Sequence, residues 1–198
     1  MRKLIGLLML VCAGSVNAAT LTFEEVGVGP SVTAFAEVGA FSFTSSQGGV
    51  AIWDAVDGGR PYLASSPDNA VYMQYVFPVS MTLTNGGAFD LNGANFGGND
   101  YGNSNQFYGY RDGELVYSEL FGTPYVGVGG SLQYHSFGWE SVDRVEFSKA
   151  YNTEGIHVMD DLQYSVSAVP LPAAAWLFIS AIAGLAGAKR LSRSKRTA

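Results

Sequence analysis

Cysteine is nearly absent from this sequence, and that limits what the mature protein contains. The single cysteine, Cys12, lies in an N-terminal segment that we expect to be removed after export. The mature chain would then carry no thiol, which excludes disulfides, thiolate metal sites and a cysteine nucleophile. Its stability must come from a hydrophobic core or from bound ions.

Positive charge is also scarce over residues 20–168. All 17 acidic residues of the chain fall there, against four basic ones, so the formal net charge of this segment is -13. A surface of this sign repels nucleic acid and anionic lipid and attracts cations. This charge disfavours nucleic-acid binding, and we predict no nucleic-acid partner.

Motifs typical of enzymes are missing. His135 and His157 are the only histidines, and they do not have metal-binding spacing. Neither a Gly-x-Ser-x-Gly nucleophile motif nor a phosphate-binding loop occurs in the mature domain. We therefore predict that the protein is not an enzyme. The alternative is a secreted polysaccharide hydrolase that uses a carboxylate pair, for which Asp54, Asp57 and Glu119 are candidates.

The first 19 residues have the three parts of a cleavable signal peptide. Basic Arg2 and Lys3 precede an apolar run over residues 4–11, and small residues up to Ala18 and Ala19 form a cleavage site. The apolar run is too short to span a bilayer as a helix. We predict cleavage after Ala18 or Ala19 and export across the inner membrane.

Residues 169–198 have the composition of a membrane-sorting tail. Residues 173–188 carry no charge, and the four residues before them extend this stretch to about 20 residues, enough for one transmembrane helix. A basic cluster follows and stays cytoplasmic by the positive-inside preference, so the domain before the helix lies outside. We expect transient anchoring in the inner membrane.

The tail opens with the motif Val169-Pro170-Leu171-Pro172. This motif, the short apolar span and the basic end together resemble the PEP-CTERM sorting domain, in its Val-Pro-Leu-Pro subclass. The resemblance implies export by the general secretory route and cleavage near the motif by a membrane-embedded exosortase, in bacteria that make exopolysaccharide. Leu171 stands where the archetype has Glu. The alternative is a plain single-span anchor without processing.

The middle segment, residues 20–168, has the length of one domain. Glycine, aromatic residues and Thr/Val-rich runs are abundant, and no segment shows a helical repeat of apolar positions. We expect strands at 21–25, 40–44, 50–53, 71–77, 80–84, 106–111, 115–121, 132–137, 142–148 and 157–167. About ten strands in one domain imply two packed sheets, so we predict an all-β, jelly-roll-like β-sandwich.

Turn signals separate these expected strands. Asp112-Gly113 predicts a tight type I′ hairpin turn, because both residues tolerate positive φ. Asn92-Gly93 reads as another turn, and the Gly/Asn-rich stretch from Asn92 to Asn105 is expected to be one long loop. Long loops on a rigid scaffold are where binding usually resides.

Two pairs of acidic residues lie in the first and last expected strands, Glu24-Glu25 and Asp160-Asp161. If these strands are neighbours, the four carboxylates converge and need a cation, and calcium suits because it takes several hard oxygen ligands. An early Glu and a late Asp also resemble the terminal strands of jelly-roll carbohydrate-binding modules, which implies a structural calcium ion. The alternative is that one carboxylate of each pair is merely solvated.

Several aromatic residues are candidates for stacking on sugar rings, with polar neighbours to bind the hydroxyl groups. The candidate ligand-binding residues are Trp53, Asp54, Tyr101, Tyr108 and Tyr110. For any single aromatic residue, a place in the core is the competing interpretation.

These features favour an exported, exosortase-sorted protein of the cell envelope or extracellular matrix. Its non-catalytic domain would bind exopolysaccharide or another matrix glycan, with calcium as a structural ion. The second hypothesis is the polysaccharide hydrolase above. A third is a structural matrix protein that assembles through its sheet edges. Fold alone does not decide among them.

Overall fold

A computed structural model describes residues 17–28, 31–46, 48–57, 59–60, 63–73, 77–98, 104–128, 130–150 and 156–166. Most of the predicted signal peptide, Tyr101 and the whole tail with Val169, Pro170, Leu171 and Pro172 lie outside these residues. Within them, no helix is long and apolar enough to cross a membrane.

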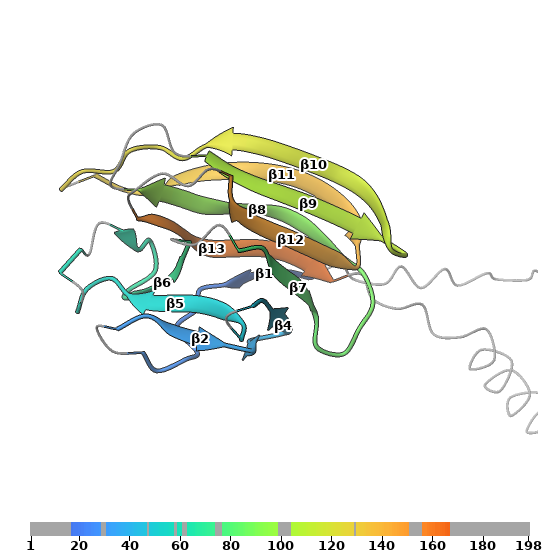
Figure 1. Ribbon diagram of the computed structural model, residues 1–198, viewed down its shortest axis with the longest axis horizontal. Helices are drawn as coiled ribbons and strands as arrows, with labels where there is room; N and C mark the ends of the chain where they lie inside the picture. The colour runs from blue at the N-terminus through green and yellow to red at the C-terminus, as the bar shows by residue number, and fades with distance from the viewer. Residues whose placement is uncertain are drawn as a thin grey trace, which may run out of the picture. The chain divides into compact units, whose positions relative to one another are not determined.

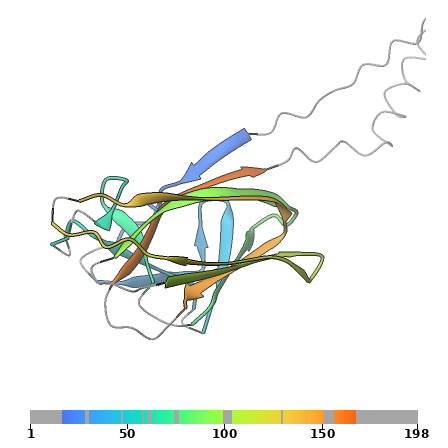
Figure 2. The same cartoon turned by 90° about the horizontal axis from the view of Figure 1, so that it is seen from above.

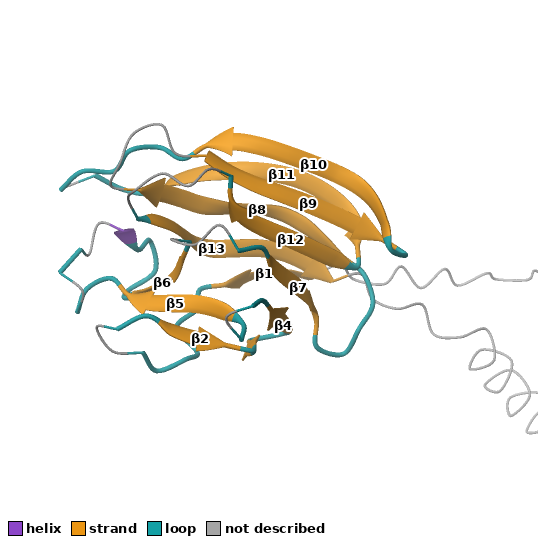
Figure 3. Ribbon diagram, in the orientation of Figure 1, coloured by secondary structure: helices purple, strands orange, loops and turns teal. Residues whose placement is uncertain are grey.

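Strands make up most of the described chain, as Figure 3 shows. In order they are β1 (Asn17–Leu21), β2 (Thr33–Phe35), β3 (Glu37–Val38), β4 (Phe41–Thr44), β5 (Val50–Asp54), β6 (Asn69–Tyr72), β7 (Val79–Leu83), β8 (Phe89–Gly98), β9 (Ser104–Arg111), β10 (Glu114–Gly122), β11 (Gln133–Val142), β12 (Arg144–Lys149) and β13 (His157–Val166).

The strands form two antiparallel sheets that pack face to face (Figures 1 and 2). One sheet has the order β11-β8-β13-β6-β5-β2, with β1 also paired to β13, and the other has the order β10-β9-β12-β7-β4-β3. The predicted two-sheet β-sandwich is therefore confirmed for the described residues.

The core lies between the sheets and is rich in phenylalanine. Strands β9 and β12 alternate buried and half-buried residues, as expected for a sheet with one wet face. Phe107 and Phe147 stack with their ring centroids 5.4 Å apart, and Phe96 meets Phe107 edge-on. Each buried phenylalanine contributes about 1.5–3 kcal/mol.

The compact unit Val16–Ser167 contains all of this core. A main cluster of buried apolar residues fills the space between the sheets, and a second cluster around Trp53, Leu63 and Val158 lies in the same unit. A unit that holds its own hydrophobic core can fold alone. It is the natural fragment for experiments.

The first and last strands are neighbours, which is the condition for the two acidic pairs to converge, since β1 pairs with β13 and Leu21 lies opposite Leu162. The predicted hairpin turn is confirmed. Asp112 and Gly113 have φ angles of 53° and 82° and join β9 to β10, as the type I′ turn requires. Strand β1 also includes Ala18 and Ala19, where signal cleavage is predicted.

Two other predictions are wrong. The first strand ends at Leu21, and Glu24 and Glu25 lie in the turn that follows it. The expected loop from Asn92 to Asn105 is largely strand, because β8 runs to Gly98 and β9 begins at Ser104.

The glycines of β8 explain the second error. A Cβ at Gly93 would lie 2.5 Å from the carbonyl oxygen of His135 and 2.3 Å from the hydroxyl of Tyr134. A Cβ at Gly97 would lie 2.5 Å from Leu132 Cδ2. These glycines therefore admit close neighbours within a strand and do not form turns.

Candidate functional site

A polar and aromatic surface covers the solvent side of the six-stranded sheet. Residues paired across antiparallel strands share a face, and β12 places Arg144 opposite Tyr110 and Glu146 opposite Tyr108. Their neighbours along the chain, such as Phe107 and Val145, are buried on the other side. We call this surface the tyrosine face, and it consists of Gln106, Tyr108, Tyr110, Arg144 and Glu146.

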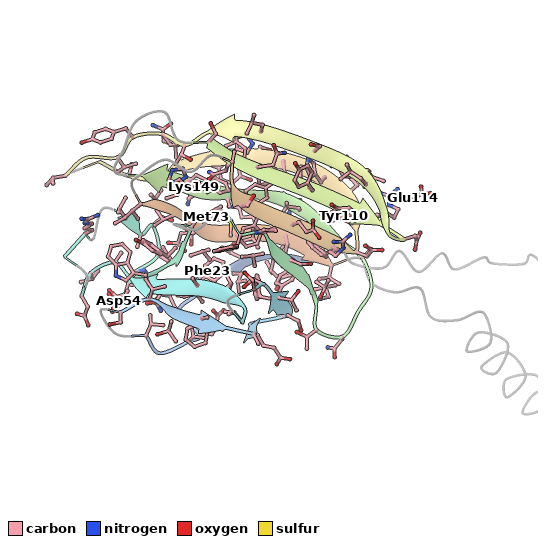
Figure 4. All side chains as sticks on the ribbon, viewed as in Figure 1. Phe23, Asp54, Met73, Tyr110, Glu114 and Lys149 are labelled. Atoms are coloured by element: carbon pink, nitrogen blue, oxygen red, sulfur yellow. The ribbon has the colours of Figure 1, made fainter. Side chains whose placement is uncertain are left out.

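Contacts among Tyr110, Arg144 and Glu146 fix one part of the tyrosine face; the Tyr110 side chain is labelled in Figure 4. The Arg144 guanidinium lies 3.7 Å from the centroid of the Tyr110 ring. The Tyr110 hydroxyl donates to Glu146 Oε2 at 3.0 Å, and Arg144 forms an ion pair with Glu146 Oε1. Partial burial, followed by the hydrogen bond and charge of Glu146, raises the pKa of Tyr110 above its ordinary value. The phenol therefore stays protonated as a donor at neutral pH.

Hydroxyl groups extend this face across the sheet. Ser80 lies opposite Glu146 on β7, and Thr44 lies opposite Ser80 on β4. On the other side of β9, Ser118 lies opposite Tyr108. A half-exposed ring surrounded by hydroxyl, amide and charged groups has the composition of a sugar-binding surface.

A second polar cluster joins three distant segments of the chain. Its members are Glu24 after β1, Ser65 and Ser66 before β6, and Asp160 and Asp161 in β13, and we call it the Ser66 cluster. Phe23 and Asp161 have left-handed φ angles of 65° and 49° beside it. At Asp161 this accompanies a break in the β13 register, and the carboxylates of Asp160 and Asp161 both lie within hydrogen-bond distance of Ser65 Oγ, at 3.1 Å and 2.7 Å.

Asp160 is fully buried and binds backbone donors. Its Oδ2 accepts from the N–H groups of Ser65 and Ser66, both at 2.8 Å, and its Oδ1 accepts from Asp161 N at 2.7 Å. Burial raises the pKa of Asp160, these N–H donors oppose the rise, and the neighbouring Asp161 carboxylate adds to it.

Glu24 binds the same loop from the other side. Its Oε1 accepts from Asn69 N at 2.7 Å and from Asp68 N at 3.1 Å. Both carboxylates therefore fix residues 65–69 against the terminal strands. This role needs no bound ion.

The surroundings of Ser66 Oγ test whether calcium fits. Glu24 Oε1, both Asp160 carboxylate oxygens and the Thr22 carbonyl lie 2.9–3.0 Å from this hydroxyl, and the Asn69 carbonyl lies at 3.4 Å. One hydroxyl proton serves at most one or two of these acceptors. Calcium prefers such a mixture of carboxylate, carbonyl and hydroxyl oxygens.

The four predicted carboxylates do not all meet. Asp161 is one step removed, since its Oδ2 accepts from Ser65 Oγ at 2.7 Å and Asn95 Nδ2 at 3.0 Å. Glu25 is exposed, and its Oε1 lies near the Gly39 turn. Over the described residues, no group of three or more Asp, Glu, His or Cys side chains is arranged to hold a metal.

The predicted ligand residues are divided between surface and core. Tyr108 and Tyr110 lie together on the tyrosine face. Trp53 is buried in the second core cluster against Tyr72, and Asp54 Oδ1 accepts from Asp57 N at 2.8 Å within a turn. Trp53 is therefore a core residue and not a surface ligand-binding residue. Tyr101 lies outside the described residues.

Sequence reasoning missed the polar partners on both sites. Arg144 and Glu146 had a usable signal, because the alternation over residues 142–147 already indicated one wet face of a strand. Ser65 and Ser66 had none, since nothing local marks a loop that binds carboxylates 94 to 96 residues away.

The hydrolase candidates are engaged in other contacts. Glu119 Oε1 lies 2.8 Å from His135 Nε2, and the His135 ring stacks on Phe121 with centroids 3.8 Å apart. Asp54 and Asp57 share a turn. None of the three lies on the tyrosine face.

A cavity of about 230 Å³ opens between β5, β6 and β12, lined mainly by apolar side chains such as Val50, Val71 and Phe147. Buried Lys149 and the half-buried Ser148 also line it. Ser45 and Tyr72 add further polar groups to the lining. This cavity is smaller than the usual ligand pocket of about 300–1,000 Å³, so the tyrosine face is the better candidate for a glycan.

Comparisons with known proteins find only distant structural similarity. No family model matches it, and no curated protein matches it. Among solved structures, TmCBM61 in complex with β-1,4-galactotriose is 13% identical, with a TM-score of 0.40, covering 65% of this chain and 88% of that one. The K2 cleaved adhesin domain of Lys-gingipain is 16% identical, with a TM-score of 0.46, covering 76% and 100%. Likeness at this level carries no information about ligand or activity.

Proposed function

We propose that this protein is an exported, non-catalytic component of the cell surface or extracellular matrix, and that its tyrosine face binds a matrix glycan. The supporting observation is the convergence of Tyr108, Tyr110, Arg144 and Glu146 on the wet side of one sheet.

Export and exosortase sorting are supported by the signal peptide and the tail from residue 169. If sorting occurs, mass spectrometry of the surface form should find a C-terminus near that motif, and an intact tail would contradict it.

Binding would use the half-exposed rings together with the polar groups around them. The face of Tyr108 would pack on the C–H face of a pyranose, while Gln106, Ser118 and Glu146 bind its hydroxyl groups. Arg144 already covers one face of Tyr110, so Tyr110 serves mainly to hold Arg144 and Glu146 in place. Because the domain is strongly acidic, we propose a neutral glycan such as an uncharged exopolysaccharide.

Replacing Tyr108 with alanine is the direct test. Loss of an aromatic anchor should weaken binding of Val16–Ser167 to a glycan array and to the host exopolysaccharide by about tenfold or more. The matched control is Tyr134→Ala, which removes an exposed tyrosine from β11 in the other sheet. Equal loss in both variants, or no saturable binding by the parent protein, would reject the tyrosine face as the site. Released sugar would instead support the hydrolase.

We also propose that calcium binds the Ser66 cluster as a structural ion. Glu24, Asp160 and the carbonyls of Thr22 and Asn69 would hold it, and the ion would supply positive charge beside the buried Asp160. At free calcium about 100-fold above its Kd the stabilisation is about 2.7 kcal/mol, or roughly 5–10 °C in Tm for a domain of this size.

Thermal unfolding in calcium and in chelator checks this. Magnesium serves as the control ion, since it demands a more regular six-coordinate site. The calcium shift should vanish in Glu24→Gln and persist in Glu25→Gln, because Glu25 lies apart from the cluster. A Tm unchanged by calcium would contradict the calcium site. Glu24 and Asp160 would then act only through their hydrogen bonds within the protein.

A further inference from the structure

Strand β10 leaves a long edge of the six-stranded sheet open. It pairs only with β9 among the described strands and runs along the upper margin of the molecule in Figure 1. Alternate N–H and C=O groups of such a strand point away from its neighbour and can pair with another strand. The opposite edge of this sheet, β3, has only two residues.

The side chains of β10 protect this edge only in part. Proteins usually guard an open edge with charged side chains, above all lysine, or with proline; β10 contains no lysine, arginine or proline, and its charged residues are Glu114 and Glu119. Leu115, Val116 and Leu120 are instead 53%, 42% and 51% exposed. Val116 is the extra residue of a bulge between Leu115 and Tyr117, which is the only irregularity in the pairing of β10 with β9.

The sequence of β10 is self-complementary about Ser118. In an antiparallel pair of two copies centred there, Val116 of each copy lies opposite Leu120 of the other, and Ser118 lies opposite Ser118. Each exposed apolar side chain would then be covered by the other copy. Leu120 shares the wet face with Ser118, since they lie opposite Gln106 and Tyr108 on β9.

We propose that two copies of this protein associate through antiparallel pairing of their β10 strands. The two six-stranded sheets then form one continuous sheet, and the two tyrosine faces lie on the same side of it. The inference rests on the open edge and on the symmetry of β10, and it does not depend on glycan binding.

Cysteine cross-linking of Val16–Ser167 tests both the partner and the register, since this unit contains no cysteine of its own. Cα atoms directly opposite each other in an antiparallel pair are close enough for a disulfide. Under mild oxidation, Ser118→Cys should give a covalent dimer on a non-reducing gel. Val116→Cys and Leu120→Cys should each stay monomeric alone and cross-link when mixed.

The control for random collision is Val128→Cys, whose side chain is 92% exposed and lies outside β10. Sedimentation equilibrium provides a second measurement, in which the parent unit should dimerise with rising concentration and Leu120→Lys should remain monomeric while Val128→Lys dimerises. The proposal fails if Ser118→Cys cross-links no faster than Val128→Cys, if the parent is monomeric throughout, or if Val116→Cys and Leu120→Cys do not cross-link with each other.

Discussion

Replacing Asp160 with asparagine is expected to lower the free energy of unfolding by about 2–3 kcal/mol. Both carboxylate oxygens accept from backbone N–H groups, Oδ2 from Ser65 and Ser66 and Oδ1 from Asp161. An asparagine must turn its amide N–H₂ toward one of these donors, whichever way it is oriented. At least one buried N–H then loses its acceptor.

Asp161→Asn is the matched control. Its carboxylate binds the Ser65 hydroxyl and the Asn95 amide, and both can reorient to suit a new side-chain amide. Chemical denaturation of the two variants should differ by about 2 kcal/mol in favour of Asp161→Asn. Equal stability of the two variants would mean that the backbone donors around Asp160 are satisfied without its carboxylate.

The pH dependence of stability gives a second check on Asp160. Its folded pKa is raised above the ordinary 3.8, so the folded protein binds this proton more tightly than the unfolded chain does. The stability contributed by this group is therefore fully present below pH 3.8 and is lost as the pH rises through the raised pKa. When stability is measured against pH in the presence of chelator, this pH-dependent part of the unfolding free energy should be found in Val16–Ser167 and be absent from its Asp160→Asn variant.

Local patterns predicted the part of the candidate site that lies on regular strands. The alternation around Tyr108 and Tyr110 sets the face on which they lie, and the Asp112-Gly113 turn fixes the register of β9 against β10. Neither requires knowledge of distant residues. Trp53 departs from such a pattern, because β5 buries Ile52 and Trp53 in succession, so alternation alone does not place its side chain.

The features that could not be predicted from local sequence depend on contacts with residues far away in the chain. Whether a glycine makes a turn or admits a neighbour depends on what lies opposite it, and for Gly93 that is the backbone of β11, about 40 residues later in the chain. The Glu24-Glu25 pair poses a similar problem, because the chain leaves β1 after Leu21 and the left-handed Phe23 precedes Glu24, which contacts Ser66. A buried phenylalanine with positive φ has no local signature.

Gly49→Ala is expected to cost about 4 kcal/mol or more, enough to unfold a marginal domain. Gly49 has a φ angle of 142°, and a Cβ there would lie 2.0 Å from the carbonyl oxygen of Phe35 and 2.4 Å from its carbonyl carbon. These are backbone atoms of β2, which pairs with β5 through Phe35 and Val50. Room for the methyl group requires the two strands to separate, which breaks this pairing at the edge of the larger sheet.

A substitution at the neighbouring Gly48 is the control that distinguishes the effect of this clash from the effect of backbone strain. It also has a positive φ, 88°, but a Cβ there would meet nothing within 4 Å. Gly48→Ala should therefore cost only about 1–2 kcal/mol for the left-handed conformation. Thermal unfolding of the two variants should show Gly49→Ala as much the less stable. If both lose the same amount, the strain at φ explains the whole effect and β2 does not press against Gly49.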